Sequence, residues 1–254
     1  MIFWLVLSAT ISRTSSRTQS KGELPDYPFK LGEKLAYSMS YGWFEIGEAH
    51  VEIDNEWWEI DGRPHFYIQC KVRTTGVFSF FSRLDVCMDS WVDVQALRPT
   101  ESSRNVAFGR SIDVRTDRFD YADSVRISTY VEDVDSKRFH VFVRNDTSLL
   151  DALSTYLYLR SQVLQSDPVG KTYSVRTFFS NDLYEFGMRY TKNQDFSLKD
   201  KKWSARRFDL LFPETEEFPS DKRAYVIATD DRLRIPLKFL IEMKYGDFSF
   251  ELVD

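Results

Sequence analysis

The chain has 254 residues, with 34 lysines and arginines against 39 aspartates and glutamates, so its formal net charge is −5. Aromatic residues make up 16% of the chain, whereas glycine (10) and proline (8) are scarce, which excludes disordered and collagen-like proteins. The acidic balance argues against a nucleic-acid-binding protein, because that surface needs clustered positive charge. The length suits one large β domain.

The N-terminal segment is typical of an export signal. Residues 2–11 are mostly apolar, too few to span a membrane, and small residues follow them. The basic residues that normally precede such a run are missing, and a disordered terminus is the alternative. We therefore predict a signal peptide or disordered N-terminus at 1–22 and a single β-rich domain at 23–254. No later stretch has the roughly 18 apolar residues that a transmembrane helix needs.

A two-residue alternation of apolar and polar side chains begins at Leu35 and predicts antiparallel strands that are buried on one face. The pair Asp61-Gly62 predicts a tight turn between two strands. Large apolar residues at 77–81 predict a short helix or coil. The strands expected in this half are 35–41, 49–53, 66–72, 84–92, 101–108, 111–116, 125–132 and 138–144.

The period changes to that of an α-helix at 147–164, where apolar residues share one face. Asp146, Thr147 or Ser148 is expected to cap the N-terminus of this helix. Its apolar face consists of Leu149, Leu153, Tyr156, Leu157 and Leu164. Further strands are expected at 171–179, 183–190, 204–211, 224–229, 235–245 and 248–252. The sequence thus predicts a mostly all-β fold: a curved antiparallel sheet or barrel-like half-barrel with one helix between two β halves.

The two cysteines, Cys70 and Cys87, are too few for a disulfide framework. They flank a turn near residue 78, so a cross-strand disulfide is one interpretation, which export would permit. The alternation favours free thiols, because Cys70 shares a strand face with apolar residues and Cys87 shares one with aspartates. Neither the cysteines nor the three histidines have the spacing of a zinc site, and we expect no cofactor and no metal.

Asp85, Asp89 and Asp93 share one strand face with Trp91. Carboxylates four residues apart on a strand are roughly 13 Å apart, too far to bind one metal ion. A solvated or polar concave surface is therefore favoured, and an ion site would need a second strand. Asp89, Trp91 and Asp93 are kept as candidate binding residues.

The densest polar cluster lies at 229–236 and reads Thr-Asp-Asp-Arg-Leu-Arg-Ile-Pro. Its adjacent carboxylates, Asp230 and Asp231, could act as acid and base, but neighbouring side chains on a strand face opposite ways. A hairpin turn, with aspartate capping backbone N–H groups, is favoured. Asp230, Asp231 and Arg234 form the second set of candidate binding residues. The basic stretch 199–207, which contains Trp203, fits either a contact with anionic lipid or glycan, or a solvated hairpin.

The aromatic content fits either a packed core or an apolar cavity inside a curled sheet. No nucleophile elbow or phosphate-binding loop is present, and no catalytic residue is assigned.

Several short motifs occur in a characteristic order over about residues 29–252. They are Gly32-Glu33-Lys34-Leu35-Ala36-Tyr37, Gly47-Glu48-Ala49, Thr75-Gly76-Val77-Phe78, Asp89-Ser90-Trp91-Val92-Asp93, Leu97-Arg98-Pro99, Tyr158-Leu159-Arg160 and Thr229-Asp230-Asp231 with Arg234-Ile235-Pro236. In this order they resemble the exported bacterial family called domain of unknown function 3108. The sequence departs from it at Ile227-Ala228, where a tryptophan is expected nearby. The resemblance implies a curled, barrel-like sheet in the periplasm or at the outer-membrane periphery of a Gram-negative-type bacterium, and it implies no catalytic residues.

We therefore expect an exported, non-enzymatic envelope protein that binds or carries a lipid or glycan, or that supports outer-membrane or envelope assembly with other envelope proteins. One alternative is a protein-interaction scaffold with a packed interior. The other is a carboxylate-dependent hydrolase of envelope polymers that uses Asp230 or Asp231. A continuous apolar cavity would favour ligand binding, an exposed apolar patch would favour the scaffold, and two carboxylates about 5–9 Å apart in a cleft would favour the hydrolase.

Overall fold

The computed structural model describes residues 16–17, 25–81, 83–109, 111–133, 136–216, 219 and 221–253. Most of the expected export signal, residues 1–22, thus lies outside the described residues; within it the two-residue strand β1 (Ser16–Arg17) is described. Among the helices that are described, none has the length and apolar composition needed to cross a membrane.

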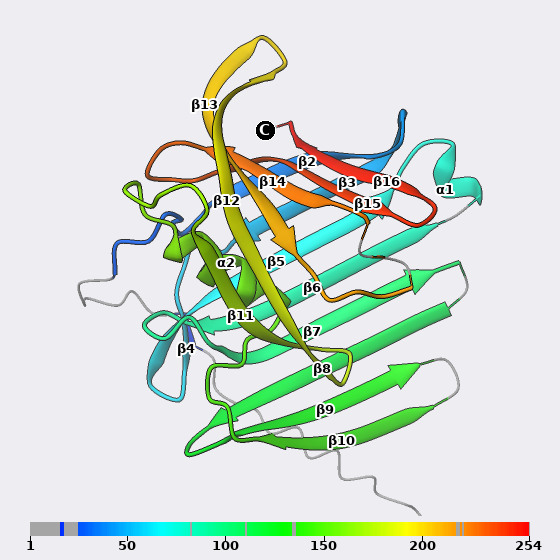
Figure 1. Ribbon diagram of the computed structural model, residues 1–254. Coiled ribbons are helices and arrows are strands. Elements are labelled where there is room, and N and C mark those ends of the chain that lie inside the picture. Colours follow the sequence, from blue (N-terminus) through cyan, green and yellow to red (C-terminus); the bar gives the residue numbers. More distant parts are fainter. Residues whose placement is uncertain are drawn as a thin grey trace, which may run out of the picture.

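The first half of the chain forms antiparallel strands joined by short turns, as the alternation predicts (Figure 1). Asp61 and Gly62 both have positive φ angles, 52° and 72°, as the expected tight hairpin turn requires. The expected short helix is α1 (Phe78–Phe81). The strands are β2 (Lys34–Tyr41), β3 (Phe44–Ile53), β4 (Trp58–Ile60), β5 (Arg63–Thr74), β6 (Leu84–Asp93), β7 (Pro99–Phe108), β8 (Ser111–Tyr121), β9 (Val125–Asp133) and β10 (Lys137–Arg144).

In the described part of the second half there are six strands, and the second and third of them form a hairpin that is much longer than expected. This hairpin projects from the rest of the sheet, and its tip carries the basic stretch that begins at Lys199 (Figure 1). The backbone of this stretch is thus a hairpin, as the solvated-hairpin interpretation expects. The strands are β11 (Thr172–Phe179), β12 (Asp182–Leu198), β13 (Lys201–Leu211), β14 (Ala224–Thr229), β15 (Pro236–Met243) and β16 (Gly246–Leu252).

The helix between the halves, α2 (Ala152–Gln162), is shorter than the predicted 147–164, and the predicted caps were wrong. Asp151 is the N-cap: its carboxylate accepts a hydrogen bond from the backbone N–H of Ser154 at 2.7 Å, and the Ser154 hydroxyl accepts from the Asp151 backbone N–H at 3.0 Å. Asp151 is extended, and Leu150 before it forms a parallel bridge with Thr177 of β11, so the helix does not begin earlier. Leu164 lies beyond the helix end and is 55% exposed.

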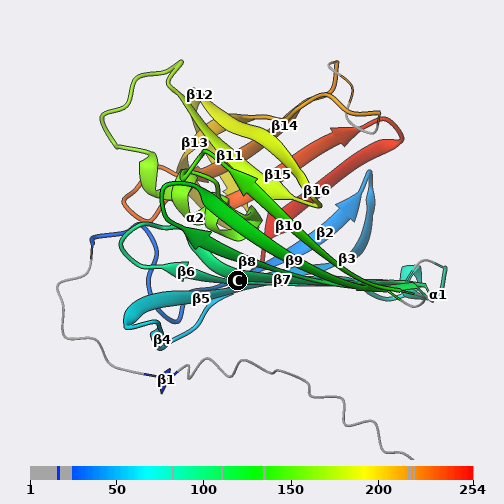
Figure 2. The same ribbon diagram turned by 90° about the horizontal axis from the view of Figure 1, so that it is seen from below.

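The strands join into one curved antiparallel sheet, which confirms the predicted fold class. Its path runs β10-β9-β8-β7-β6-β5-β3-β2-β16-β15-β14-β13-β12-β11. The two halves of the chain meet where β2 pairs with β16 near the middle of this path. In the described part of the chain, β10 and β11 are the two ends of the path, so the sheet is curled but remains open (Figure 2).

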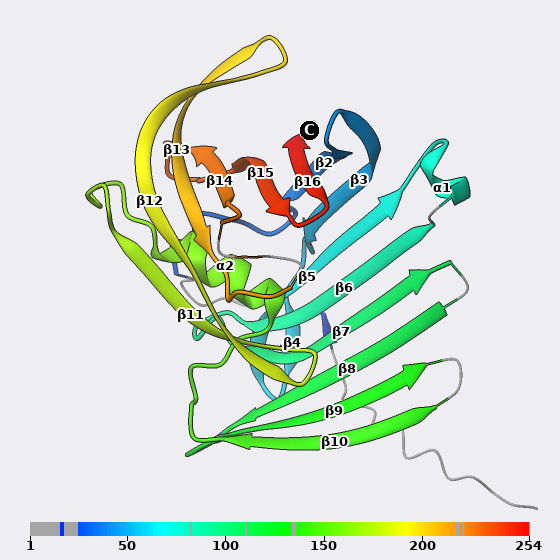
Figure 3. The same cartoon turned by 45° about the vertical axis from the view of Figure 1, so that its right-hand side comes forward.

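Helix α2 lies in the hollow of the curled sheet, between β11 and β12 on one side and β5 and β6 on the other (Figure 3). Leu153 and Leu157 point toward β5 and β6 and join a buried cluster with Phe66, Ile68 and Val92. Val163, just after the helix, packs instead with residues of β12 and β13. The helix therefore separates two apolar layers of the interior.

Both cysteines are free, as the alternation predicts. Cys70 pairs across the strands with Met88, whereas Cys87 pairs with Lys71. Directly paired residues lie on the same side of a sheet, so the two thiols lie on opposite sides. This arrangement rules out the cross-strand disulfide.

Candidate functional site

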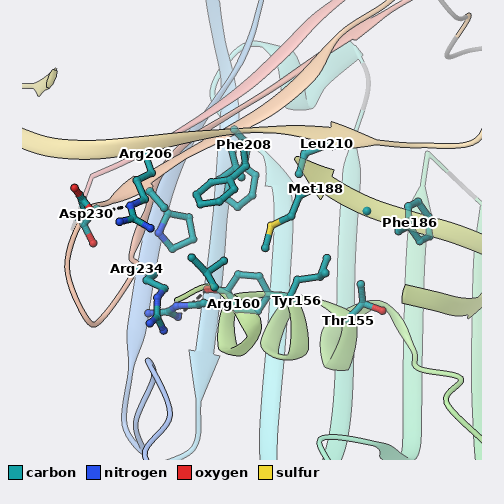
Figure 4. Close-up of a pocket in the computed structure, with 18 of the residues that line it drawn as sticks. Thr155, Tyr156, Arg160, Phe186, Met188, Arg206, Phe208, Leu210, Asp230 and Arg234 are labelled. Atoms are coloured by element: carbon teal, nitrogen blue, oxygen red, sulfur yellow. Dashed lines mark hydrogen bonds and ion pairs between the residues drawn. The ribbon is translucent and has the colours of Figure 1, made fainter. Parts of the chain in front are cut away.

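A mainly apolar cavity of about 220 Å³ lies between α2 and the inner face of β12, β13, β14 and β15 (Figure 4). Its apolar end is lined by Phe186, Leu210 and Phe212, all partly exposed. Its other end holds three arginines and two aspartates. The cavity is therefore a pocket with one hydrocarbon-like end and one charged end.

The helical wall of the cavity follows from the spacing of side chains on α2. Ala152, Thr155, Tyr156 and Leu159 recur at intervals of three and four residues, which places them on one face. The Thr155 hydroxyl lies 2.6 Å from that of Thr177, so its hydrogen bond is satisfied within the protein. The opposite face of α2 is occupied by the core residues described above, so this face is the one free to line a cavity.

The strand wall of the cavity follows from the two-residue period. Met188 pairs with Leu210, and Phe208 pairs with Val226, so these side chains point to the same side of the sheet. Met188, Phe208 and Val226 belong to one buried apolar cluster, with Phe239 of β15 packed against it. The wall is thus a continuous apolar surface built from four neighbouring strands.

Arg160, in the last turn of α2, anchors the charged end of the cavity. Its side chain is buried and makes an ion pair with Glu33, with Nη1 and Nη2 2.5 and 3.1 Å from the two carboxylate oxygens. It also donates to the backbone carbonyls of Leu233, at 2.8 Å, and Pro28, at 3.1 Å. These bonds join α2 to the segment before β2 and to the turn between β14 and β15.

Arg206 of β13 is also buried and neutralised. Its Nε donates to the carboxylate of Asp230 at 2.6 Å, and its Nη atoms donate to the backbone carbonyls of Leu164 and Gln165 at 2.9 and 2.6 Å. The Gln165 side chain donates to the same Asp230 oxygen at 2.9 Å. Asp230 therefore holds the chain after α2 against the sheet.

Asp231 stabilises the turn between β14 and β15. Its Oδ1 accepts hydrogen bonds from the Thr229 hydroxyl at 2.7 Å and from the backbone N–H groups of Leu233 and Arg234 at 2.9 and 3.0 Å. This is the aspartate-capped turn that the sequence favoured at 229–236. Arg234 itself has a positive φ of 49°, and its side chain lines the cavity.

Arg234 differs from the other two arginines because its side chain lacks a carboxylate partner among the described residues. Its Nε is buried and, within the part of the chain that the structure describes, has no hydrogen-bond partner. Burial and then the nearby charges of Arg206 and Arg160 lower the pKa of Arg234 below its ordinary value. The charged end of the cavity thus contains one cation, Arg234, that has no counterion in contact with it among the residues that the structure describes.

The two sets of candidate residues lie apart in the fold. Asp230, Asp231 and Arg234 line the cavity, whereas Asp89 and Trp91 lie on the opposite face of the sheet. Asp93 lies at the end of β6, where its carboxylate pairs with Arg63 at 2.8 Å and accepts from the backbone N–H groups of the following turn. The structure therefore does not bring the six residues into one site.

On the outer face, Asp89 is surrounded by donors rather than left solvated. It accepts hydrogen bonds from the Tyr67 hydroxyl at 2.5 Å, from the Gln69 amide at 2.6 Å and from the Ser103 hydroxyl at 3.0 Å. The pKa of Tyr67 is raised by burial and by this carboxylate. Trp91 packs against Tyr67 with ring centroids 5.0 Å apart. These contacts make a self-satisfied polar and aromatic cluster on the convex surface.

The carboxylates of the cavity are held by the chain itself. Asp230 is paired with Arg206, and the oxygen of Asp231 is bonded to the turn. Within the described ranges, no group of three or more histidines, cysteines and acidic residues could hold a metal ion. The arrangement can bind an apolar chain and contact a charged group at one end.

Sequence reasoning missed Arg160, Arg206, Met188 and Phe208 as site residues. A signal existed for Arg206 and Phe208, because they alternate on the expected strand 204–211. Arg160 stands in the helix motif but gave no indication of its partner, Glu33, which is 127 residues away in sequence.

Comparisons with known proteins agree with this architecture. The family model described as "Protein of unknown function (DUF3108)" matches residues 36–253. No curated protein matches the chain. A solved structure, the β-barrel-like protein of domain of unknown function DUF1849 from Brucella abortus, is similar in fold, with a TM-score of 0.54 and 9% sequence identity. The similarity covers 89% of this chain and 98% of that one, and at this identity it concerns the fold alone.

Proposed function

The chain belongs to the DUF3108 family, and we propose that it is a non-enzymatic lipid-binding protein that holds the hydrocarbon part of its ligand in the cavity beside α2. The observation that carries the proposal is the continuous apolar lining contributed by α2, β12, β13, β14 and β15. The sequence left lipid and glycan open, and this lining favours lipid. A glycan needs many hydrogen-bonding side chains, and those of the cavity gather at one end only.

The size of the cavity supports the same choice. An apolar cavity of about 150 Å³ inside a protein stays dry and accepts a hydrophobic molecule such as benzene. The cavity here, about 220 Å³, is larger, and it has a mouth where Gln165 and Asp231 are exposed. It therefore has room for a single hydrocarbon chain, and removing that chain from water supplies the driving force for binding.

The contacts of the aspartates argue against the hydrolase alternative. A carboxylate pair that cleaves a polymer must present free oxygens to the substrate. Asp230 instead forms an ion pair with Arg206 through Oδ1, and Asp231 uses its Oδ1 to accept three hydrogen bonds from the turn, so each carboxylate has a structural role. We propose that these residues shape the site and do no chemistry.

The proposal places the protein in the bacterial envelope, in the periplasm or at the outer-membrane periphery. This location rests on the apolar segment at 2–11 and on the family resemblance. An envelope location would supply the ligand, because membrane lipids and their breakdown products occur there.

The test is saturable binding of the uncharged fluorescent probe N-phenyl-1-naphthylamine. We expect one saturable site in the wild-type protein and loss of binding in Ala228→Leu, because Ala228 lines the cavity and the larger side chain would fill it. Ala122→Leu, at an exposed turn position, is the matched control and should bind normally. Native mass spectrometry of protein isolated from its own host should show a co-purifying lipid. Absence of saturable binding, or equal binding by Ala228→Leu, would refute the proposal.

A second candidate function, protein interaction, is favoured by the edge strand β10. Phe139, Val141 and Val143 are 65%, 41% and 54% exposed on this strand. An unpaired edge with apolar side chains is a common place for strand addition by a partner. Replacing Phe139 with lysine should then abolish co-purification of a partner while leaving probe binding unchanged; unchanged co-purification would refute this candidate.

A further inference from the structure

We infer that the ligand of the cavity carries an anionic head group and that Arg234 is the residue that recognises it. This inference rests on the proposed lipid binding and adds the chemical class of the ligand: a single-chain amphiphile ending in a carboxylate or a phosphate monoester. It follows from the position and the pairing of three arginines at one end of the cavity.

The three arginines gather where the apolar lining ends. Figure 4 shows Arg160, Arg206 and Arg234 at one end of the cavity and Phe186 at the other, with Met188 and Phe208 between them. A chain lying along the apolar wall therefore has its terminus beside the guanidinium groups. This geometry separates the part of the site that binds hydrocarbon from the part that contacts a polar head.

Two of the three cations, Arg160 and Arg206, are already neutralised within the protein. Arg160 is bound by Glu33 and two backbone carbonyls, and Arg206 is bound by Asp230 and two backbone carbonyls. Each side-chain nitrogen of both residues donates at least one hydrogen bond to the protein. Neither has a free fork of N–H groups for a ligand.

Arg234 has the opposite surroundings. Its Nε is buried without a hydrogen-bond partner in the described chain, and its positive neighbours Arg206 and Arg160 act on it more strongly than any acidic group. The adjacent Asp231 directs its Oδ1 to the backbone of the turn, including the N–H of Arg234. An anionic oxygen from a ligand would provide the missing acceptor and the missing counterion together.

The volume restricts the ligand to one chain. About 220 Å³ accommodates a single acyl chain beside α2, whereas a phospholipid with two chains would need considerably more apolar space. Arginine binds the planar carboxylate and the phosphate group equally well in geometry, because its N–H donors form a fork that matches both. We therefore name the shared chemistry, a terminal anionic oxygen on a single chain, and let the experiment distinguish the two head groups.

The experiment measures binding of decanoate, decyl phosphate and the uncharged ester methyl decanoate by displacement of N-phenyl-1-naphthylamine. All three have chains of similar length, so they differ mainly in the head group. We expect at least one of the anions to bind about tenfold or more tightly than the ester, as a charge-assisted hydrogen bond provides. The tighter anion identifies the preferred head group.

Two variants locate the effect. Arg234→Gln should bring the favoured anion to the affinity of the ester while leaving the ester's affinity unchanged. Arg232→Gln is the matched control, because Arg232 lies in the same turn but is exposed and pairs with Asp26. It should keep the full preference.

The possible failures are distinguishable. Equal binding of anions and ester by the wild-type protein would overturn this inference and leave lipid binding intact. The inference would also be overturned if the Arg234→Gln variant kept its preference for the anion, or if it bound the anion and the ester more weakly by the same factor. If none of the compounds displaces the probe, the inference is overturned, and failure of the probe itself to bind overturns the proposed function with it.

Discussion

Replacing Arg160 with methionine should destabilise the protein more than any change of an exposed arginine. Arg160 is buried, and its side chain holds Glu33, of which only 12% of the side chain is exposed. Methionine would leave that carboxylate without its partner and would remove the donors to the carbonyls of Leu233 and Pro28. Breaking a buried ion pair by removing one partner costs about 3–5 kcal/mol. That is a large part of the roughly 5–15 kcal/mol by which native domains are stable.

The assay is equilibrium unfolding in urea, followed by tryptophan fluorescence. With a slope of about 3 kcal/mol/M, a loss of about 4 kcal/mol lowers the unfolding midpoint by about 1.3 M. Arg118→Met is the control, because Arg118 is 52% exposed and pairs with Glu101 on the surface, where an ion pair contributes about 0–1 kcal/mol.

A double variant tests the cause of the loss. Glu33→Gln combined with Arg160→Met leaves no lone buried charge, so it should be less destabilised than the two single changes added together. If Arg160→Met stays within about 1 kcal/mol of the wild type, as Arg118→Met should, the ion pair does not hold α2 in place and the reasoning is wrong.

Three further predictions concern the sheet. Burial raises the pKa of the Cys70 thiol from 9.0 to about 11, so its alkylation rate in the native protein should reach its half-maximum near pH 11; a value near 9 would contradict the buried position. In this pH range the Cys70 thiol keeps its proton in the folded state and loses it in the unfolded state, so the free energy of unfolding should fall as pH rises from about 9 to 11. Urea unfolding of Cys70→Ala, measured across the same range, should lack this part of the pH dependence. Gly47→Ala should destabilise the protein by about 1–3 kcal/mol in the same urea assay, because the added Cβ would lie 2.1 Å from the carbonyl oxygen of Arg73. The control is Lys71→Ala, at an exposed position of the neighbouring strand β5 that is not subject to that clash, and a similar loss in both variants would argue against the clash.

Local patterns were sufficient for much of the fold. The alternation beginning at Leu35 located the strands of the first half, and Asp61-Gly62 located a hairpin turn, because side-chain direction and turn backbone depend on adjacent residues. The same alternation placed Cys70 and Cys87 on opposite faces. The turn at 229–236 was also predictable, since Asp231 bonds to residues no more than three positions away.

The candidate site was predictable only in part. The sequence singled out Asp230, Asp231 and Arg234, but it gave them no apolar wall, and it also singled out Asp89, which lies on the other face of the sheet. The helix start was misplaced because several residues near 146–151 can cap a helix, and the bridge between Leu150 and Thr177 selects the last of them.

The sequence by itself therefore determined where most of the strands lie, which face many of their side chains take and where several turns occur. Only the tertiary structure decided that β2 pairs with β16 and that α2 lies inside the curled sheet. It also decided that Glu33 pairs with Arg160 and Asp230 with Arg206. Arg234 has no such partner among the described residues. The physical reason is distance along the chain. Alternation and turn chemistry act between near neighbours, whereas the pairing of β2 with β16 and the ion pair of Arg160 with Glu33 join residues more than a hundred positions apart.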